Sequence, residues 1–314
     1  MSESNPHVDS NRDEYLARSN SHSFDVEFSV PQTHRLRFTE NCFGGDFTVL
    51  RDVFEASVNQ TARLQVWVDD GVAKWDEKLL SQIADRIEST PGLELTSPVR
   101  TIAGGEDVKN EPAIVNGLLK AFDDDHLDRR SYVVVVGGGA VLDTVGYAAA
   151  VAHRGLRLVR LPTTTLSQAD SGVGVKNAVN WFGKKNWKGT FATPWAVIND
   201  QYLLQGLSDR DFRCGFSEAV KVALLKDPEF FQFLCANADK ISLREKEPAS
   251  HAIKQSVLLH LDHITRGGDP FEFRQARPLD FGHWVAHKLE AVTNYRLRHG
   301  EAVSIGVAVD TAYS

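Results

Sequence analysis

Cysteine is scarce in this sequence, and apolar runs are short. Cys42, Cys214 and Cys235 are the only cysteines among 314 residues, and they stand far apart. This usage argues against a disulfide framework and a cysteine-based zinc site, and it is typical of a reduced, cytoplasmic protein. No apolar stretch has the length of a membrane-spanning helix. We therefore expect no membrane partner.

Positive charge is also in the minority. Lys and Arg number 35 against 42 Asp and Glu, which gives a formal net charge of −7. Nucleic acids and anionic membrane surfaces attract proteins with an excess of basic residues, so neither is an expected partner. A protein of this composition that binds an anion must gather its lysines locally.

The two ends of the chain carry few structural signals. Residues 1–22 are polar and lack the apolar segment of a signal peptide, so we expect a disordered or loosely attached arm. At the other end, an apolar helical run over 302–312 is followed almost at once by Ser314. We expect the last domain to be cut short there.

Apolar strands alternate with helical segments in the first 200 residues. The predicted strands lie at 24–30 and 34–38 (a candidate hairpin), 63–68, 93–101 and 132–136, and the predicted helices at 74–89, 111–123 and 140–153. Such alternation is typical of a parallel α/β sheet. Later segments are helical, at 211–225, 228–236, 249–265 and 282–295. The sequence thus predicts a Rossmann-like α/β domain over 23–200 and an all-helical domain over 201–314.

Three glycines form the strongest local signal. Gly137, Gly138 and Gly139 stand between a buried strand and a helix that carries Asp143. Glycines at a helix N-terminus allow a phosphate to approach free backbone N–H groups. The spacing is not the dinucleotide fingerprint GxGxxG, so a tight strand–helix connection without a ligand remains an alternative. A second glycine loop, over 104–109, fits either a cofactor groove or a solvated turn.

A hydroxyl-rich stretch follows over 162–186. It contains Thr163, Thr164, Asp170 and Lys176, and it ends at Asn186. Hydroxyls and amides suit a polar ligand, and lysines suit phosphate. An exposed Ser/Thr/Gly loop is the alternative interpretation.

Metal-capable residues occur in the predicted helical domain. Glu218 and Lys221 stand three apart among apolar neighbours, and His283 and His287 stand four apart, with His299 further on. Such spacings place side chains on one helix face. Two or three histidines with a carboxylate can form a catalytic metal site with an open position. A surface ion pair and packed histidines are the alternatives.

Together these motifs resemble the 3-dehydroquinate synthase superfamily of sugar phosphate cyclases, over about 104–306. The resemblance implies a cytoplasmic homodimer that binds NAD and a divalent metal, zinc or cobalt. It implies that NAD contacts Asp69, Glu106, Lys109, Gly137, Gly138, Gly139, Asp143, Thr163, Thr164, Asp170 and Lys185. It implies that Glu218, His283 and His299 hold the metal. Lys176, Asn186, Lys221 and His287 correspond to substrate or phosphate contacts, and Arg154 to an arginine that reaches the neighbouring subunit's phosphate site.

The sequence departs from the family pattern where the family holds a substrate carboxylate. His260 stands where a Lys is expected, although nearby Lys254 leaves that alignment open. Asp280 replaces an Asn, Arg277 is offset by one, and residues 267–271 are an insertion. These changes make the pocket less positive, and Asp280 would repel a carboxylate. We therefore expect a phosphorylated ketose without a carboxylate, such as sedoheptulose 7-phosphate.

The resemblance also implies the reaction. A carbinol is oxidised transiently by NAD, phosphate is eliminated, the hydride returns, and an aldol step closes a carbocycle. Three alternatives remain: 3-dehydroquinate synthase proper, a metal-dependent polyol dehydrogenase on the same plan, and an inactive relative. Lys176, Asn186 and Lys221 favour a cyclase, since a dehydrogenase needs no phosphate pocket. The family's later phosphate-binding Lys corresponds to a position beyond Ser314.

Overall fold

The computed structural model describes residues 25–26, 28–55, 61–267, 271, 280–294 and 296–314. The chain divides into a unit over Met1–Gln32 and a unit over Thr33–Ser314, and every helix and strand described lies in the second. The arm predicted over 1–22 lies outside the described residues. None of the helices in the described ranges combines the length and the apolar character that a membrane crossing requires.

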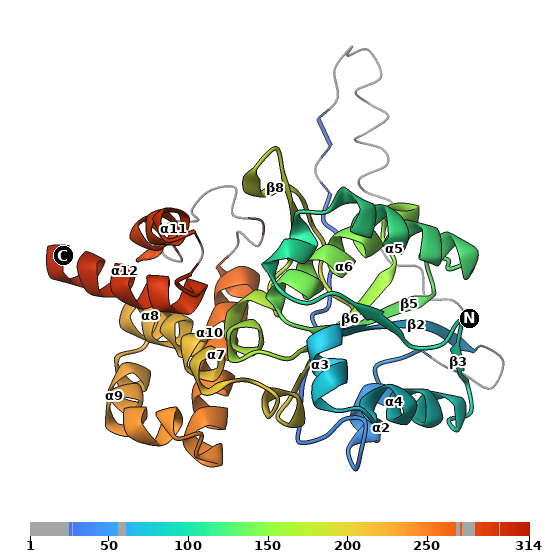
Figure 1. Cartoon of the computed structure of the whole chain (residues 1–314), viewed down its shortest axis with the longest axis horizontal. Coiled ribbons are helices and arrows are strands. Elements are labelled where there is room, and N and C mark those ends of the chain that lie inside the picture. Colours follow the sequence, from blue (N-terminus) through green and yellow to red (C-terminus); the bar gives the residue numbers. More distant parts are fainter. Residues whose placement is uncertain (1–24, 27, 56–60, 268–270, 272–279, 295) are drawn as a thin grey trace, which may run out of the picture. The chain divides into compact units, whose positions relative to one another are not determined.

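A parallel sheet forms the centre of the first half of this unit (Figure 1). Its strand order is β1-β9-β6-β5-β2-β3, and β4 also pairs with β2. All of these pairings are parallel, as the alternating pattern predicts. The strands are β1 (Leu36–Thr39), β2 (Ala62–Asp69), β3 (Leu93–Leu95), β4 (Arg100–Ile102), β5 (Tyr132–Gly137), β6 (Arg157–Pro162) and β9 (Ala196–Asp200).

The valine run of β5 is apolar on both faces, so helices must cover both faces of the sheet. Successive side chains of a strand point to opposite faces, so Val134 and Val136 pack in one apolar cluster and Val133 and Val135 in another. Figure 1 shows α5 and α6 over one face and α2, α3 and α4 under the other. These helices are α2 (Phe47–Arg51), α3 (Asp70–Trp75), α4 (Leu79–Glu88), α5 (Pro112–Asp124) and α6 (Gly139–Val151).

The direction of chain winding changes between β2 and β5. From β2 the chain runs to β3 and β4 on one side, and it then enters β5 on the other side. Ligands of open α/β sheets bind outside the carboxyl ends of the strands at such a switch point. Here those ends are Asp69 of β2 and Gly137 of β5.

An antiparallel hairpin leaves the sheet between the neighbouring strands β6 and β9. It consists of β7 (Lys176–Trp181) and β8 (Lys184–Phe191). Arg160, which is fully buried, holds the segment that leads into the hairpin. Its guanidinium donates to the carbonyls of Gly172 and Gly174 at 3.0 and 2.9 Å and to the side chain of Asn177 at the start of β7. Burial lowers the pKa of Arg160 to about 10, which still leaves the guanidinium charged at neutral pH. The tip is open to solvent, with Phe182 80% exposed.

The second half of the unit is helical. It comprises α7 (Asp209–Cys214), α8 (Phe216–Lys226), α9 (Pro228–Ser242), α10 (Lys246–Arg266), α11 (His283–Val292) and α12 (His299–Tyr313). Residues of α11 and α12 pack with Val220 and Leu224 of α8 in one small apolar cluster. Gly306 of α12 lies so close to Gly282 that a Cβ on it would stand 1.9 Å from the Gly282 carbonyl oxygen. These helices thereby bring three metal-capable segments together.

Several predicted elements differ in the structure. The described residues of 24–30 form no strand, and β1 pairs in parallel with β9, so the predicted hairpin is wrong. Alternating polarity is not sufficient for a strand, which also needs a partner. The predicted strand over 93–101 is two short strands, and the helix over 74–89 is interrupted at the extended Asp76. The hairpin of β7 and β8 was not predicted.

Candidate functional site

A cavity of about 570 Å³ opens at the carboxyl ends of β2, β5 and β6. We call it the glycine-turn cavity. Most of the residues predicted to bind NAD line it, namely Asp69, Glu106, Lys109, Gly138, Gly139, Asp143, Thr163, Thr164 and Lys185. Gly137 lies behind them as the last residue of β5, and Asp170 lies outside this cavity. The structure therefore brings together segments that are far apart in the sequence.

The glycine turn is packed too closely for larger side chains. A Cβ on Gly137 would stand 2.7 Å from Val141, and one on Gly139 would stand 3.1 Å from the Ser171 hydroxyl. Gly138 precedes α6 as its N-cap residue, in extended conformation. The N-terminus of this 13-residue helix therefore faces the cavity through backbone rather than side chains. Such an arrangement favours a phosphate group.

Asp69, the last residue of β2, contributes a carboxylate to the wall of the glycine-turn cavity. Its Oδ1 accepts a hydrogen bond from the Gly71 backbone N–H at 2.8 Å, which caps α3. Burial raises the pKa of Asp69, and the backbone N–H of Gly71 opposes this shift. A carboxylate can accept hydrogen bonds from sugar hydroxyls.

Lys109 joins three parts of the cavity wall. Its ammonium forms a 2.7 Å ion pair with Asp143 of α6 and donates to the side chain of Asn186 on β8. Lys109 is only 4% exposed, although it belongs to a short 3₁₀ helix in a loop (Glu106–Lys109). The loop over 104–109 is thus part of the cavity wall and not merely a solvated turn.

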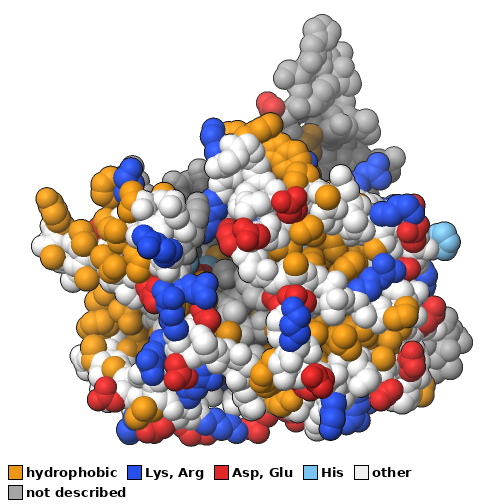
Figure 2. Space-filling view, in the orientation of Figure 1, with side chains coloured by type: hydrophobic (Ala, Val, Ile, Leu, Met, Phe, Trp, Pro, Cys, Tyr) orange, Lys and Arg blue, Asp and Glu red, His pale blue; other side chains and the backbone are white. Residues whose placement is uncertain are grey.

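A second cavity, of about 520 Å³, adjoins the first, and we call it the histidine cavity. The two share Asp143, Ser171, Lys185, Asn186 and His299. Figure 2 shows a hollow on this face of the molecule, with Lys and Arg side chains gathered along its helical side. The predicted site residues that line the histidine cavity are Asp143, Asp170, Lys176, Lys185, Asn186, Lys221, His260, Asp280, His283, His287 and His299.

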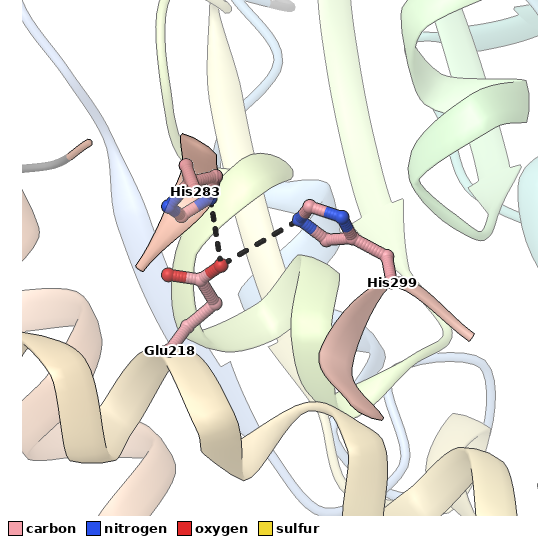
Figure 3. Close-up of side chains that lie close together, drawn as sticks. All are labelled: Glu218, His283 and His299. Carbon is pink, nitrogen blue, oxygen red and sulfur yellow. Dashed lines mark ion pairs between the residues drawn. The ribbon is translucent and has the colours of Figure 1, made fainter. Parts of the chain in front are cut away.

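Two imidazoles converge on one carboxylate at the edge of the histidine cavity (Figure 3). Glu218 Oε1 lies 3.3 Å from His283 Nε2 and 3.7 Å from His299 Nε2. Two ligand atoms that each lie about 2.1 Å from a tetrahedral zinc ion would be about 3.4 Å from each other. The set of one carboxylate and two imidazoles therefore fits a single divalent cation in both geometry and chemistry.

The electrostatics of this cluster follow from burial and close pairing. Burial alone would raise the pKa of Glu218, but hydrogen bonds from His283 and His299 and the charge of Lys221 hold it well below its usual value. Burial opposes the protonation of His299, yet Glu218 and Glu290 raise its pKa to about 9. A proton on the His299 imidazole thus supplies positive charge where a cation would, so cation binding there releases a proton.

Lys221 and His287 complete this region. Lys221 is 3% exposed and forms an ion pair with Glu218 one helical turn earlier. His287 is exposed, and its ring centroid lies 5.6 Å from that of His283. Partial burial and the nearby His283 lower the pKa of His287, which favours the neutral imidazole.

The remaining predicted residues fall in different places. His260 faces the histidine cavity and lies 3.0 Å from Asp170, whereas Lys254 is exposed beside the ring of Phe38. The geometry therefore places His260, and not Lys254, at the site. Arg277 lies outside the described residues. Arg154 is exposed and lines neither cavity, so its predicted role in a neighbouring subunit stays a prediction.

Comparison with known proteins identifies the family. A model of the 3-dehydroquinate synthase N-terminal domain matches residues 99–214, and one of the C-terminal domain matches residues 215–314. The chain belongs to the 3-dehydroquinate synthase family. The resemblance and the predicted fold class are thus confirmed. The boundary predicted near residue 200 stays a prediction, since the two family models meet at 214/215.

Members of the 3-dehydroquinate synthase family include two similar curated proteins. A 3-dehydroquinate synthase from a Nitratiruptor species is 40% identical over 67% of this chain and 58% of the relative. A 2-epi-valiolone synthase from Actinosynnema mirum is 44% identical over 62% of this chain and 51% of the relative. The aligned part of the chain thus spans little more than half the length of these relatives.

Solved structures of the family show the same fold. ValA, a 2-epi-5-epi-valiolone synthase from Streptomyces hygroscopicus subsp. jinggangensis 5008 solved with NAD+ and Zn2+, gives a TM-score of 0.79 at 26% identity, covering 91% of this chain and 76% of ValA. A 2-deoxy-scyllo-inosose synthase gives a TM-score of 0.70 at 24% identity, covering 87% of this chain and 71% of that one. The latter likeness concerns the fold alone.

The sequence interpretation missed Glu290 and Arg160, which are buried charged residues of this family member. Glu290 stands three residues after His287 and seven after His283, so its helical spacing was a usable signal. Arg160 lies within a strand and carries no such signal, because its contacts come from the later segment 172–177.

Proposed function

We propose that this chain is an NAD- and metal-dependent sugar phosphate cyclase that acts on a phosphorylated ketose without a carboxylate. The proposal rests on one observation: the glycine-turn and histidine cavities share a wall, and His299 of the candidate metal cluster is part of that wall. A ligand in one cavity would lie directly beside a ligand in the other.

The residues present fit both groups that such an enzyme needs. In this proposal Gly138, Gly139 and Asp69 hold NAD in the glycine-turn cavity, and Glu218, His283 and His299 hold the cation. The match to ValA, which was solved with NAD+ and Zn2+, supports this assignment. When bound, NAD would accept and return a hydride, and the cation would polarise hydroxyl oxygens of the sugar.

The chain's own residues would bind and orient the anionic substrate. Lys176, Lys185 and Lys221 place three ammonium groups around the histidine cavity of a protein whose net charge is −7. Ammonium groups bind phosphate as point charges. Asn186, held by Lys109, would orient a sugar hydroxyl, and neutral His287 would accept a proton at an imidazole nitrogen.

The substrate preference follows from the carboxylates of the histidine cavity. Asp170 pairs with His260, and Asp280 lines the same cavity. A substrate carboxylate placed there would meet negative charge. We therefore propose a neutral-headed ketose phosphate, such as sedoheptulose 7-phosphate. A homodimer in which Arg154 reaches the neighbouring phosphate site is part of the same proposal.

Phosphate release tests the function. With NAD and zinc, the purified protein is expected to release inorganic phosphate from sedoheptulose 7-phosphate at least about tenfold faster than from the heptulosonate substrate of 3-dehydroquinate synthase. Repulsion of the heptulosonate carboxylate needs to cost only about 1.4 kcal/mol to produce this difference. The reverse preference would support 3-dehydroquinate synthase proper. Accumulation of NADH with a polyol would support a dehydrogenase. Release from neither sugar phosphate would overturn the proposal.

Exchanging the two unusual residues should change the preference. The double variant His260→Lys/Asp280→Asn removes one negative charge and adds one positive charge near the proposed head group. We expect the kcat/KM ratio to move at least about tenfold toward the heptulosonate, because a hydrogen bond to a charged group is worth about 1.5–3 kcal/mol. Lys254→Ala, on the exposed face of the same helix, should leave the ratio unchanged. An unaltered ratio in the double variant would remove the basis of the substrate assignment.

A further inference from the structure

Glu290 is a buried carboxylate that contacts two other elements. It lies on α11 and is 4% exposed. Its Oε2 lies 3.2 Å from His299 Nδ1 on α12, and its Oε1 lies 3.3 Å from Lys185 Nζ on β8. One side chain therefore connects the candidate metal cluster with the hairpin.

We propose that Glu290 is a positioning residue that fixes His299 for cation binding and holds Lys185 at the junction of the two cavities. This inference rests on the proposed function, because the cation belongs to that proposal. Glu290 itself is not one of the three residues that converge on the cation site.

The two ring nitrogens of His299 have different partners, Glu290 at Nδ1 and Glu218 at Nε2. A neutral imidazole carries a proton on one nitrogen and a lone pair on the other. Glu290 accepts a hydrogen bond from the Nδ1–H group, so Nε2 is the nitrogen that can give up its proton and present a lone pair to a cation. Nε2 is also the atom that faces Glu218 at 3.7 Å. Glu290 thus selects the tautomer and the ring orientation that a cation requires.

His283 provides an internal comparison. Its Nδ1 lies 3.2 Å from the backbone carbonyl of Phe281, so its ring is oriented by a neutral acceptor. His299 has a carboxylate acceptor instead, and the other oxygen of that carboxylate lies 3.3 Å from the ammonium of Lys185. A charged acceptor increases the basicity of the imidazole, so His299 should depend on its partner more than His283 does.

The ion pair between Glu290 and Lys185 connects α11 with the hairpin. Lys185 lines both cavities, and β8 is exposed along almost its whole length. The ion pair with Glu290 is a contact between this exposed strand and α11. Loss of Glu290 should therefore weaken phosphate binding as well as cation binding.

Zinc affinity of the metal-free full chain tests the proposal without turnover. Competition with a chromophoric chelator should show about 10–100-fold weaker zinc binding in Glu290→Ala, the usual effect of removing such a partner. Glu290→Gln should lie between this variant and the wild type, because an amide oxygen still accepts from Nδ1 but is uncharged. Glu229→Gln, an exposed acid in the first turn of α9, is the matched control and should bind zinc as the wild type does.

A cobalt spectrum separates positioning from a general loss of structure. Glu290→Gln should retain the wild-type unfolding temperature in the metal-free state and yet show an altered visible absorption of bound Co2+. Wild-type zinc affinity and an unaltered cobalt spectrum in Glu290→Gln and Glu290→Ala would overturn the proposal. Failure of the wild type to bind zinc would overturn it together with the metal assignment. Weaker zinc binding in the variants would uphold it even if no sugar phosphate is turned over.

Discussion

Glu218→Ala is expected to abolish turnover and zinc binding together. Glu218 is the carboxylate on which both imidazoles converge, and it is 2% exposed, so water cannot readily replace it. A catalytic cation contributes several kcal/mol to a transition state, and about 4 kcal/mol corresponds to a rate loss of about a thousandfold. Phosphate release and chelator competition on the same preparation provide the measurement.

Glu218 also has a structural role that the experiment must separate. The substitution removes the ion-pair partner of buried Lys221, and breaking a buried pair costs about 3–5 kcal/mol of stability. Glu218→Gln keeps the side-chain size and should fold more readily than Glu218→Ala while still losing zinc. Thermal unfolding monitors this difference, and Glu229→Gln is again the control. Wild-type turnover in either Glu218 variant would refute the metal assignment.

Gly306→Ala is expected to destabilise the protein, although alanine favours helices. The added Cβ would stand 1.9 Å from the Gly282 carbonyl oxygen, so α12 must move away from the start of α11. Overpacking costs about 1–3 kcal/mol, and a clash this close with backbone belongs at the upper end of that range, above the helix-propensity gain of about 1 kcal/mol. Because His283 and His299 begin these two helices, zinc affinity should fall as well.

Gly117→Ala supplies the matched control for this prediction. Gly117 is also inside a helix, α5, but a Cβ there would meet nothing within 4 Å. This substitution should raise the free energy of unfolding by about 0.5–1 kcal/mol. Denaturant unfolding measures both variants. Equal stabilisation by the two substitutions would show that α11 and α12 do not pack as closely as described.

The fold was predictable where local pattern and burial agree. The valine run of β5 followed by three glycines predicts a buried strand and a close turn, and the structure has both. The hairpin of β7 and β8 was missed because β8 is polar and almost wholly exposed, so its sequence shows no apolar face, and its pairing with β7 depends on antiparallel register. Local periodicity does not report such pairing.

In the candidate site, too, local spacing predicted some features, and tertiary contacts determined others. The spacing between His283 and His287 suggested a metal pair, but helix packing places His299, from another helix, beside Glu218 instead. Only the family resemblance anticipated that choice. Lys109 resembled a residue of a solvated loop, and its burial arises from contacts with Asp143 and Asn186 far along the chain. Tertiary contacts of this kind leave little trace in a single sequence.

The position of the hairpin has a consequence for engineering. It departs from β6 and returns to β9, which are neighbours in the sheet, so its outer part can be exchanged without altering the strand order. Arg160 and Asn177 secure the segment from which it rises, whereas Lys185 and Asn186 lie near the exposed turn. Grafting only residues 180–188 between relatives should therefore transplant ligand-facing chemistry while the scaffold of the recipient stays intact.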